Sequence, residues 1–156
     1  MSFAVVENWV EAPLRRFVDD ARILIAVVLH PSGQVLAQSG FTRAVDVMSA
    51  CALAAAIHAS AGELGKMLEG RAFGALHHAG RARQIFLAPI LTPRSTFLVL
   101  AVFDRESSLG LVQLYFNELS SGIAAAAPLP VEQAPVLAND FERELNRNLA
   151  ALFGRA

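Results

Sequence analysis

The sequence predicts an α+β domain built on a five-stranded antiparallel sheet, with a long helix between the second and third strands and an extra helix at the C-terminus. Three observations predict this class. Five short apolar runs have the length and composition of strands. Short turns separate successive runs, which favours antiparallel neighbours. One alanine-rich stretch, residues 43–68, instead repeats its apolar residues at three- and four-residue steps, the period of a helix.

Length and composition agree with one small domain. The chain has 156 residues, of which 54% are hydrophobic and 17% are charged, so disorder is excluded for most of its length. Its 13 basic and 14 acidic residues give a net charge of −1. Because a nucleic-acid-binding protein normally carries a basic excess or stripe, this balance argues against nucleic acid as a partner.

Targeting signals and disulfides are not expected. The opening residues, MSFAVVENWVEA, lack the basic region and apolar run of a signal peptide. The uncharged stretch at residues 47–62 is too short and too polar to span a membrane. A single cysteine excludes an internal disulfide. We therefore expect a cytoplasmic protein without a membrane span.

The first predicted elements are a helix and a hairpin. Residues 3–20 place apolar side chains at helical steps, although Pro13 is expected to kink or divide the helix. Residues 23–29 form a continuous β-branched apolar run, typical of a strand buried on both faces. Pro31 and Gly33 supply turn chemistry, and residues 34–39 are predicted to form the return strand.

The long helix predicted at residues 43–68 has two apolar sides. We expect the larger stripe to cover the domain's own sheet. The smaller stripe then has to meet a second element or a second chain. The larger stripe contains Val47, Ala50, Ala54, Ile57, Ala61, Leu64 and Leu68, and the smaller one contains Met48, Cys51, Ala52, Ala55, Ala59 and Gly62.

The remaining elements complete the sheet and its cover. Strands are predicted at residues 73–78, 83–90 and 96–103, and a helix at 109–127. Prolines at 128 and 130 end this helix, and the segment APLPVEQAP has the composition of a linker. An amphipathic helical pattern follows over residues 136–153, which Asn139 or Asp140 could cap partway along. The predicted organisation is a domain at 1–127, a linker at 128–135 and a helical extension at 136–156.

Catalytic, cofactor and metal motifs are not found in the sequence. Cys51 has no base within reach, since His58 is seven residues away, about 10 Å along a helix. His77 and His78 are adjacent, so on a strand they point to opposite faces and cannot share a metal. Phosphate-binding glycine loops and nucleophile elbows are also missing. The sequence therefore predicts a binding protein without catalytic residues, cofactor or metal.

The order of elements resembles the roadblock/dynein light-chain family, in its bacterial and archaeal MglB-like branch. The resemblance covers about residues 5–125, which leaves residues 128–156 outside the minimal domain. One departure is the turn at residues 30–32, which replaces an acidic turn common in relatives. The resemblance is carried by the hairpin ILIAVVLHPSGQVLAQSG, the alanine-rich helix after it, the strand pair RQIFLAPI and TFLVLAVF, and the LGLV start of the following helix.

The resemblance implies a dimeric, non-enzymatic regulator or scaffold of a small Ras-like GTPase. In such homodimers or heterodimers the third strand pairs across a two-fold axis, and the long helices lie side by side. Carried over, the dimer strand contains Phe73, Ala75 and His77. The GTPase docks on the small-residue face of the paired helices. Here that face corresponds to Ala52, Ala55, Ala59 and Gly62.

Three alternatives stay open at this point. A related profilin-like or PAS-like sheet could serve as a small-ligand sensor or accessory subunit, with His77 or His78 lining a pocket. An enzyme could use Cys51. If GTP hydrolysis is stimulated, an arginine supplied in trans is the alternative to ordering of the GTPase's own residues. The candidate arginines are Arg43, Arg81, Arg83 and Arg94.

Overall fold

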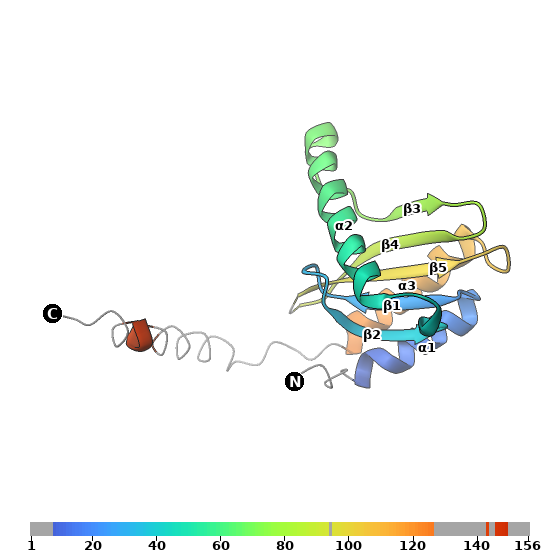
Figure 1. Cartoon of the computed structure of the whole chain (residues 1–156), viewed down its shortest axis with the longest axis horizontal. Helices are drawn as coiled ribbons and strands as arrows, with labels where there is room; N and C mark the ends of the chain where they lie inside the picture. The colour runs from blue at the N-terminus through green and yellow to red at the C-terminus, as the bar shows by residue number, and fades with distance from the viewer. Residues whose placement is uncertain (1–7, 94, 127–142, 144–145, 150–156) are drawn as a thin grey trace.

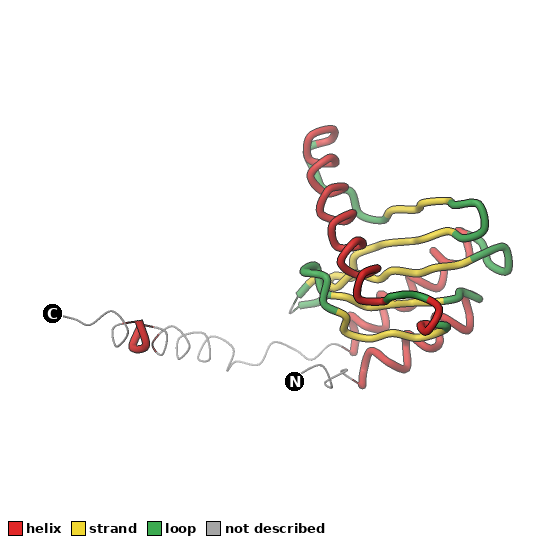
Figure 2. Tube along the Cα trace, viewed as in Figure 1, coloured by secondary structure: helices red, strands yellow, loops and turns green. Residues whose placement is uncertain are grey.

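The computed structural model describes residues 8–93, 95–126, 143 and 146–149. A helix is followed by a hairpin, a short 3₁₀ helix and a long helix, then by three strands and a further helix (Figures 1 and 2). The helices are α1 (Asn8–Ala21), η2 (Thr42–Ala44), α2 (Val47–Glu69) and α3 (Leu109–Ala126). The strands are β1 (Ile25–Leu29), β2 (Val35–Gly40), β3 (Leu76–Ala79), β4 (Gln84–Leu91) and β5 (Thr96–Phe103).

The five strands form one antiparallel sheet in the order β2-β1-β5-β4-β3. Strand β1 pairs with β2 on one side and β5 on the other, with Ile25 opposite both Gly40 and Val102. All five β1 residues are buried, as its unbroken apolar run predicts. The predicted fold class and five-stranded antiparallel sheet are therefore confirmed, and β2 and β3 are the two edges of the sheet.

Helices cover both faces of the sheet (Figure 1). Helices α1 and α3 pack together on one face, over a core that includes Phe86 and Phe116, whose ring centroids are 5.2 Å apart. Helix α2 lies on the other face, above a second cluster that includes Leu87 and Leu100. Neighbouring residues of β4 thus point to opposite layers, as the two-residue period of a strand requires.

Several predicted boundaries differ from the structure. Helix α1 continues through Pro13, so the expected division of this helix is wrong. Proline removes a single backbone donor, and the apolar face of α1 still packs on the sheet. The long helix begins at Val47 because Asp46 caps it, and the residues predicted as its first turn form η2 instead.

The third strand is shorter than predicted. It spans Leu76–Ala79, so Phe73 and Ala75 precede it. Helix α2 ends at Glu69, and its C-cap Gly70, with a φ of 79°, reverses the chain direction. The loop then folds back along the helix before pairing begins. The linker predicted at 128–135 lies outside the described residues. Of the predicted C-terminal helix, residues 143 and 146–149 are described, and all of them are helical.

Candidate interaction surface

Helix α2 crosses the sheet and extends past its β3 edge (Figure 1). Its first half packs on the sheet through Cys51, Ala54 and Ala55, which all belong to the second core cluster. None of the helix residues 56–64 is buried. Half of this helix is therefore supported by the sheet, while the remainder presents most of its circumference to solvent.

The ends of α2 are well defined. The Asp46 carboxylate accepts a 2.6 Å hydrogen bond from the Ser49 hydroxyl and a 3.3 Å bond from the Ser49 backbone N–H. These two bonds, the hydroxyl first, hold the pKa of Asp46 below its ordinary value, because they favour the ionised form. At the other end the Gly70 N–H donates to the Lys66 carbonyl at 3.0 Å.

The second half of α2 extends past the β3 edge of the sheet (Figure 1), and we call it the overhanging half. It is held by the loop that follows it. A Cβ added to Gly65 would lie 2.5 Å from the Phe73 nitrogen and 2.7 Å from the Arg71 carbonyl oxygen. Only glycine permits this approach, so Gly65 fixes the angle at which α2 leaves the sheet. Phe73, predicted to lie in the dimer strand, instead packs against the helix at this point.

One side of α2 carries large exposed aliphatic residues, which we call the leucine side. They recur at the steps of a helical stripe, yet they are 40–68% exposed. Three of them, Ile57, Leu64 and Leu68, belong to the larger predicted stripe, so the expectation that this whole stripe covers the sheet is wrong. Its first members, Val47, Ala50 and Ala54, do pack on the sheet, and the stripe becomes exposed where α2 extends past the sheet edge (Figure 1). The leucine side consists of Leu53, Ile57, Leu64 and Leu68.

A second exposed side of α2 consists of small residues, and we call it the alanine side. It contains Ala52, Ala56 and Ala59, and no charged residue occurs in α2 before Glu63. Of the four residues predicted to form the docking face, Ala52 and Ala59 are therefore exposed. Gly62 is half-buried and faces Ala72.

The fourth predicted docking residue, Ala55, requires a correction. It is only 8% exposed and packs on the domain's own sheet, so it cannot contact a partner in this conformation. Sequence reasoning also missed Ala56. The helical period could not separate the two, because residues 52, 55, 59 and 62 share a stripe as well as residues 52, 56 and 59 do.

Strand β3 is an exposed edge beside the overhanging part of α2. His77, the predicted dimer-strand residue that lies within β3, hydrogen-bonds through Nε2 to Gln84 Oε1 at 2.7 Å and stacks on Phe103 at 6.1 Å. His78 and Ala79 are exposed as well. Between them, β3 and the leucine side offer unpaired backbone groups and apolar side chains near the same edge.

The histidines and Cys51 lack the surroundings of a catalytic or metal site. Cys51 is fully buried, and desolvation raises the pKa of its thiol, so it stays protonated. Within the described ranges, no group of three or more His, Cys, Asp and Glu residues is placed to hold a metal ion. The described residues thus give no support to an enzyme that uses Cys51.

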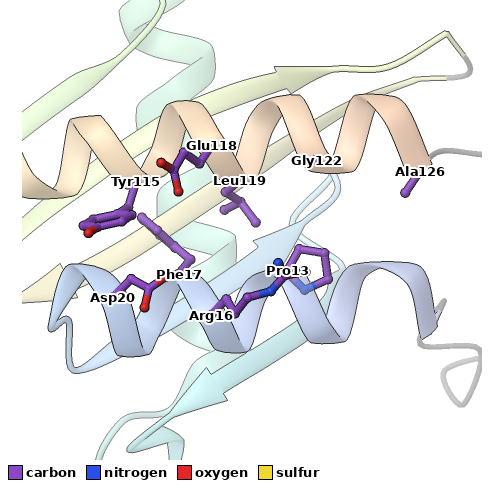
Figure 3. Close-up of a pocket in the computed structure, with 9 residues that line it drawn as sticks. All are labelled: Pro13, Arg16, Phe17, Asp20, Tyr115, Glu118, Leu119, Gly122 and Ala126. Atoms are coloured by element: carbon purple, nitrogen blue, oxygen red, sulfur yellow. The ribbon is translucent and has the colours of Figure 1, made fainter.

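A shallow groove of about 240 Å³ lies between α1 and α3, on the opposite layer from α2 (Figure 3). Phe17 and Leu119 line it together with the charged residues Arg16, Asp20 and Glu118. These three charges are exposed, so the groove lacks the desolvated polar group that orients a small ligand. Neither His77 nor His78 lines it, and the sensor alternative gains no support from it.

By length and composition alone, α2 is the one helix of the described chain that could cross a membrane. It runs for 23 residues, longer than the uncharged stretch considered from the sequence. The same helix packs its first half on a sheet through three buried residues. The first half of α2 is therefore part of the domain's own core.

The layered sheet with one long crossing helix is the fold of the roadblock/LC7 domain. The structure of Myxococcus xanthus MglB is similar to this chain, with a TM-score of 0.70 and 24% identity over 76% of this chain and 94% of the other. The gliding protein MglB of Thermus thermophilus matches with a TM-score of 0.68 and 23% identity, over 79% and 91% of the two chains.

A third similar structure is a roadblock/LC7 domain. The Roadblock/LC7 domain from Streptomyces avermitilis matches with a TM-score of 0.59 and 17% identity, over 74% of this chain and 92% of the other. Neither a protein-family profile nor a curated protein sequence matches the chain. The likeness therefore establishes the fold, and this confirms the fold that the sequence resemblance implied.

Proposed function

We propose that this protein is an MglB-like, non-enzymatic regulator or scaffold of a small Ras-like GTPase and that it acts as a cytoplasmic homodimer. The observation that carries the proposal is that two sides of α2 are exposed. This helix presents both the leucine side and the alanine side to solvent, next to an open sheet edge. Contiguous exposed apolar surface of this kind marks an interaction site.

The leucine side and β3 suit a second copy of the chain. An edge strand with unpaired N–H and C=O groups can pair with its symmetry mate. The leucine side of α2 then packs against its counterpart, which removes Leu64 and Leu68 from water. A structure titled "MglB with tetrameric arrangement", with a TM-score of 0.65 and 22% identity, supports self-association as a property available to this fold.

The alanine side suits the GTPase. Small residues allow another backbone to approach closely, and the absence of charge before Glu63 favours a mainly apolar contact. Ala52 and Ala59 lie seven residues apart, about 10 Å along one side of the helix. This spacing supports a contact over two helical turns.

The proposal is tested with the full-length chain and the small Ras-like GTPase of the same organism, loaded with GDP or with a non-hydrolysable GTP analogue. We expect a complex with at least one nucleotide state. Ala59→Arg should weaken it by about tenfold or more, because the long cation blocks close approach. Gln113→Arg is the matched control, since Gln113 is exposed on α3 in the opposite layer and should leave affinity unchanged.

Two results would overturn the proposal. One is the absence of a complex in both nucleotide states at tens of micromolar protein. The other is equal weakening by Ala59→Arg and Gln113→Arg, which would place the contact elsewhere. Mass in solution is measured for both variants, and an unchanged mass shows that Ala59→Arg acts on docking and not on self-association.

A further inference from the structure

A second apolar groove lies at the other edge of the sheet, away from β3. Its volume is about 580 Å³, and it is lined by residues 32–38 of the β1–β2 turn and β2 together with Met48 and Ala52 of α2. None of these lining residues is charged. Met48 is 77% exposed beside it. The groove therefore suits an uncharged aliphatic segment.

The strand beside this groove is an edge without the usual protection. Residues 35–40 of β2 contain neither a charged residue nor proline, the features that normally keep an edge strand from pairing further. Alternate N–H and C=O groups of β2 point away from β1 and have no partner in the described sheet. An extended segment could add here as a sixth strand and direct alternate side chains into the groove.

The chain supplies a segment of matching chemistry shortly after α3. Residues 134–138, Ala-Pro-Val-Leu-Ala, are uncharged and aliphatic, whereas residues 139–147 carry five charges. Proline tolerates an edge position if its missing N–H faces outward. With Pro135 so placed, the N–H groups of Ala134, Val136 and Ala138 all face β2.

The connection is long enough. Helix α3 runs back from the end of β5, so it ends at the end of the sheet where the β1–β2 turn lies (Figure 1). Seven residues, 127–133, span up to about 24 Å. Only α1 separates α3 from the β2 side on that layer, and packed helix axes are about 8–10 Å apart. A tether of this length gives an effective concentration of about 1 mM, so weak pairing suffices.

We propose that residues 134–138 of the same chain add to β2 as an edge strand and place one aliphatic side chain, from Val136 or Leu137, in the groove beside Met48. In this proposal the C-terminal helix predicted from residue 136 begins only after this strand, at the Asn139 or Asp140 cap. The groove shares Ala52 with the alanine side. If the proposed function holds, the docked segment therefore competes with the GTPase, and releasing it tightens the complex.

Methionine methyl groups report on docking in the full-length protein. The chain has three methionines, Met1, Met48 and Met67, so a methyl-labelled sample gives an assignable spectrum. The variants are Val136→Asp and Leu137→Asp, made separately, with Leu129→Asp as the matched control in the neighbouring uncharged segment. We expect one of the two test variants to shift the Met48 signal, and neither to shift that of Met67. The control should leave both signals unchanged.

Adjacent strand residues point to opposite faces, so the alternation tests the mode of binding. No Met48 shift in either test variant overturns the proposal, as does an equal shift in both or in Leu129→Asp. The position of the wild-type Met48 signal should also be independent of protein concentration, because docking within one chain does not depend on concentration. A wild-type Met48 signal that moves on dilution to its position in the test variant would overturn the proposal.

Peroxide oxidation gives a second measurement on the same samples. In the variant that releases the segment, Met48 should oxidise about fivefold faster or more, since steric shielding of the sulfur is lost, while the Met67 rate stays constant. Equal Met48 rates in the variant and the wild type count against the proposal. If no GTPase binds, the proposed function fails, but the methyl shifts and oxidation rates still decide whether the segment docks.

Discussion

The backbone nitrogen of Phe73 lies 2.5 Å from the position that a Cβ on Gly65 would occupy. This close contact joins the overhanging half of α2 to the loop that enters β3. It therefore positions the leucine side of α2 relative to β3, the two parts of the proposed dimer surface. A glycine inside a helix normally destabilises it, and its presence here has a packing reason.

Gly65→Ala and Gly62→Ala should have opposite effects on stability. The first forces a methyl group against backbone atoms and should cost about 1–3 kcal/mol. In the second the new Cβ meets the Ala72 Cβ at 3.7 Å, an ordinary contact, so the helix should gain up to about 1 kcal/mol. Urea unfolding at neutral pH measures both. Equal changes in the two variants would contradict this account of Gly65.

Leu64→Glu and Leu68→Glu should convert the protein from dimer to monomer. A buried carboxylate on each side of a two-fold contact is unpaired and repels its mate. Light scattering after gel filtration reports the mass, with 16.7 kDa expected for the monomer and twice that for the dimer. Leu114→Glu is the control, because Leu114 is 54% exposed on α3 and Leu64 is 50% exposed. A monomeric Leu114→Glu variant would show that exposed leucines in general, and not the leucine side, hold the dimer.

Cys51 should react slowly with iodoacetamide. Its thiol is buried and its pKa is raised by desolvation, so the native chain should be alkylated at least about 100-fold more slowly than the urea-unfolded chain. The raised pKa of Cys51 also makes the free energy of unfolding depend on pH. As pH rises above the pKa of an exposed thiol, the unfolded state releases a proton that the native state retains. Stability should therefore fall over that alkaline range in the wild type, and Cys51→Ala should lose this component. Rapid alkylation of the native chain would contradict the burial of Cys51.

Asp46→Ala should lower the urea midpoint of unfolding by removing the N-cap of α2. Because hydrogen bonds from Ser49 lower the pKa of Asp46, the wild-type advantage is fully present above the pKa of an unfolded aspartate. It should disappear as pH falls through the lower, native pKa. Ser49→Ala in both backgrounds completes a double-mutant cycle. An advantage that is independent of pH would show that the carboxylate charge is not involved.

Much of the architecture was predictable from local patterns. The run at residues 23–29 is apolar on every residue, so a strand buried on both faces was predicted, and β1 is buried throughout. The short turns around Gly33 and at residues 92–95 predicted antiparallel neighbours, which the registers of β1–β2 and β4–β5 confirm. These features depend on periodicity and turn chemistry, which act over a few residues.

The sides of α2 were harder to predict. Both the alanines and the leucines recur at helical steps, so periodicity alone cannot say which side meets the sheet. The choice depends on how closely helix and sheet approach, and Cys51, Ala54 and Ala55 allow the closer packing. The family resemblance placed Ala55 on the docking face, whereas the structure covers it with the domain's own sheet.

The sequence by itself therefore determined the element order, the antiparallel sheet and the charge-poor long helix, because these follow from short-range patterns. Only the tertiary structure decided which sides of α2 face solvent, where β3 begins, and that Gly65 ties the helix to the strand loop. Those features depend on tertiary contacts between elements, and the local sequence pattern around each residue does not indicate which residue it contacts. The candidate interaction surface belongs to this second group, since it is defined by what the domain leaves uncovered.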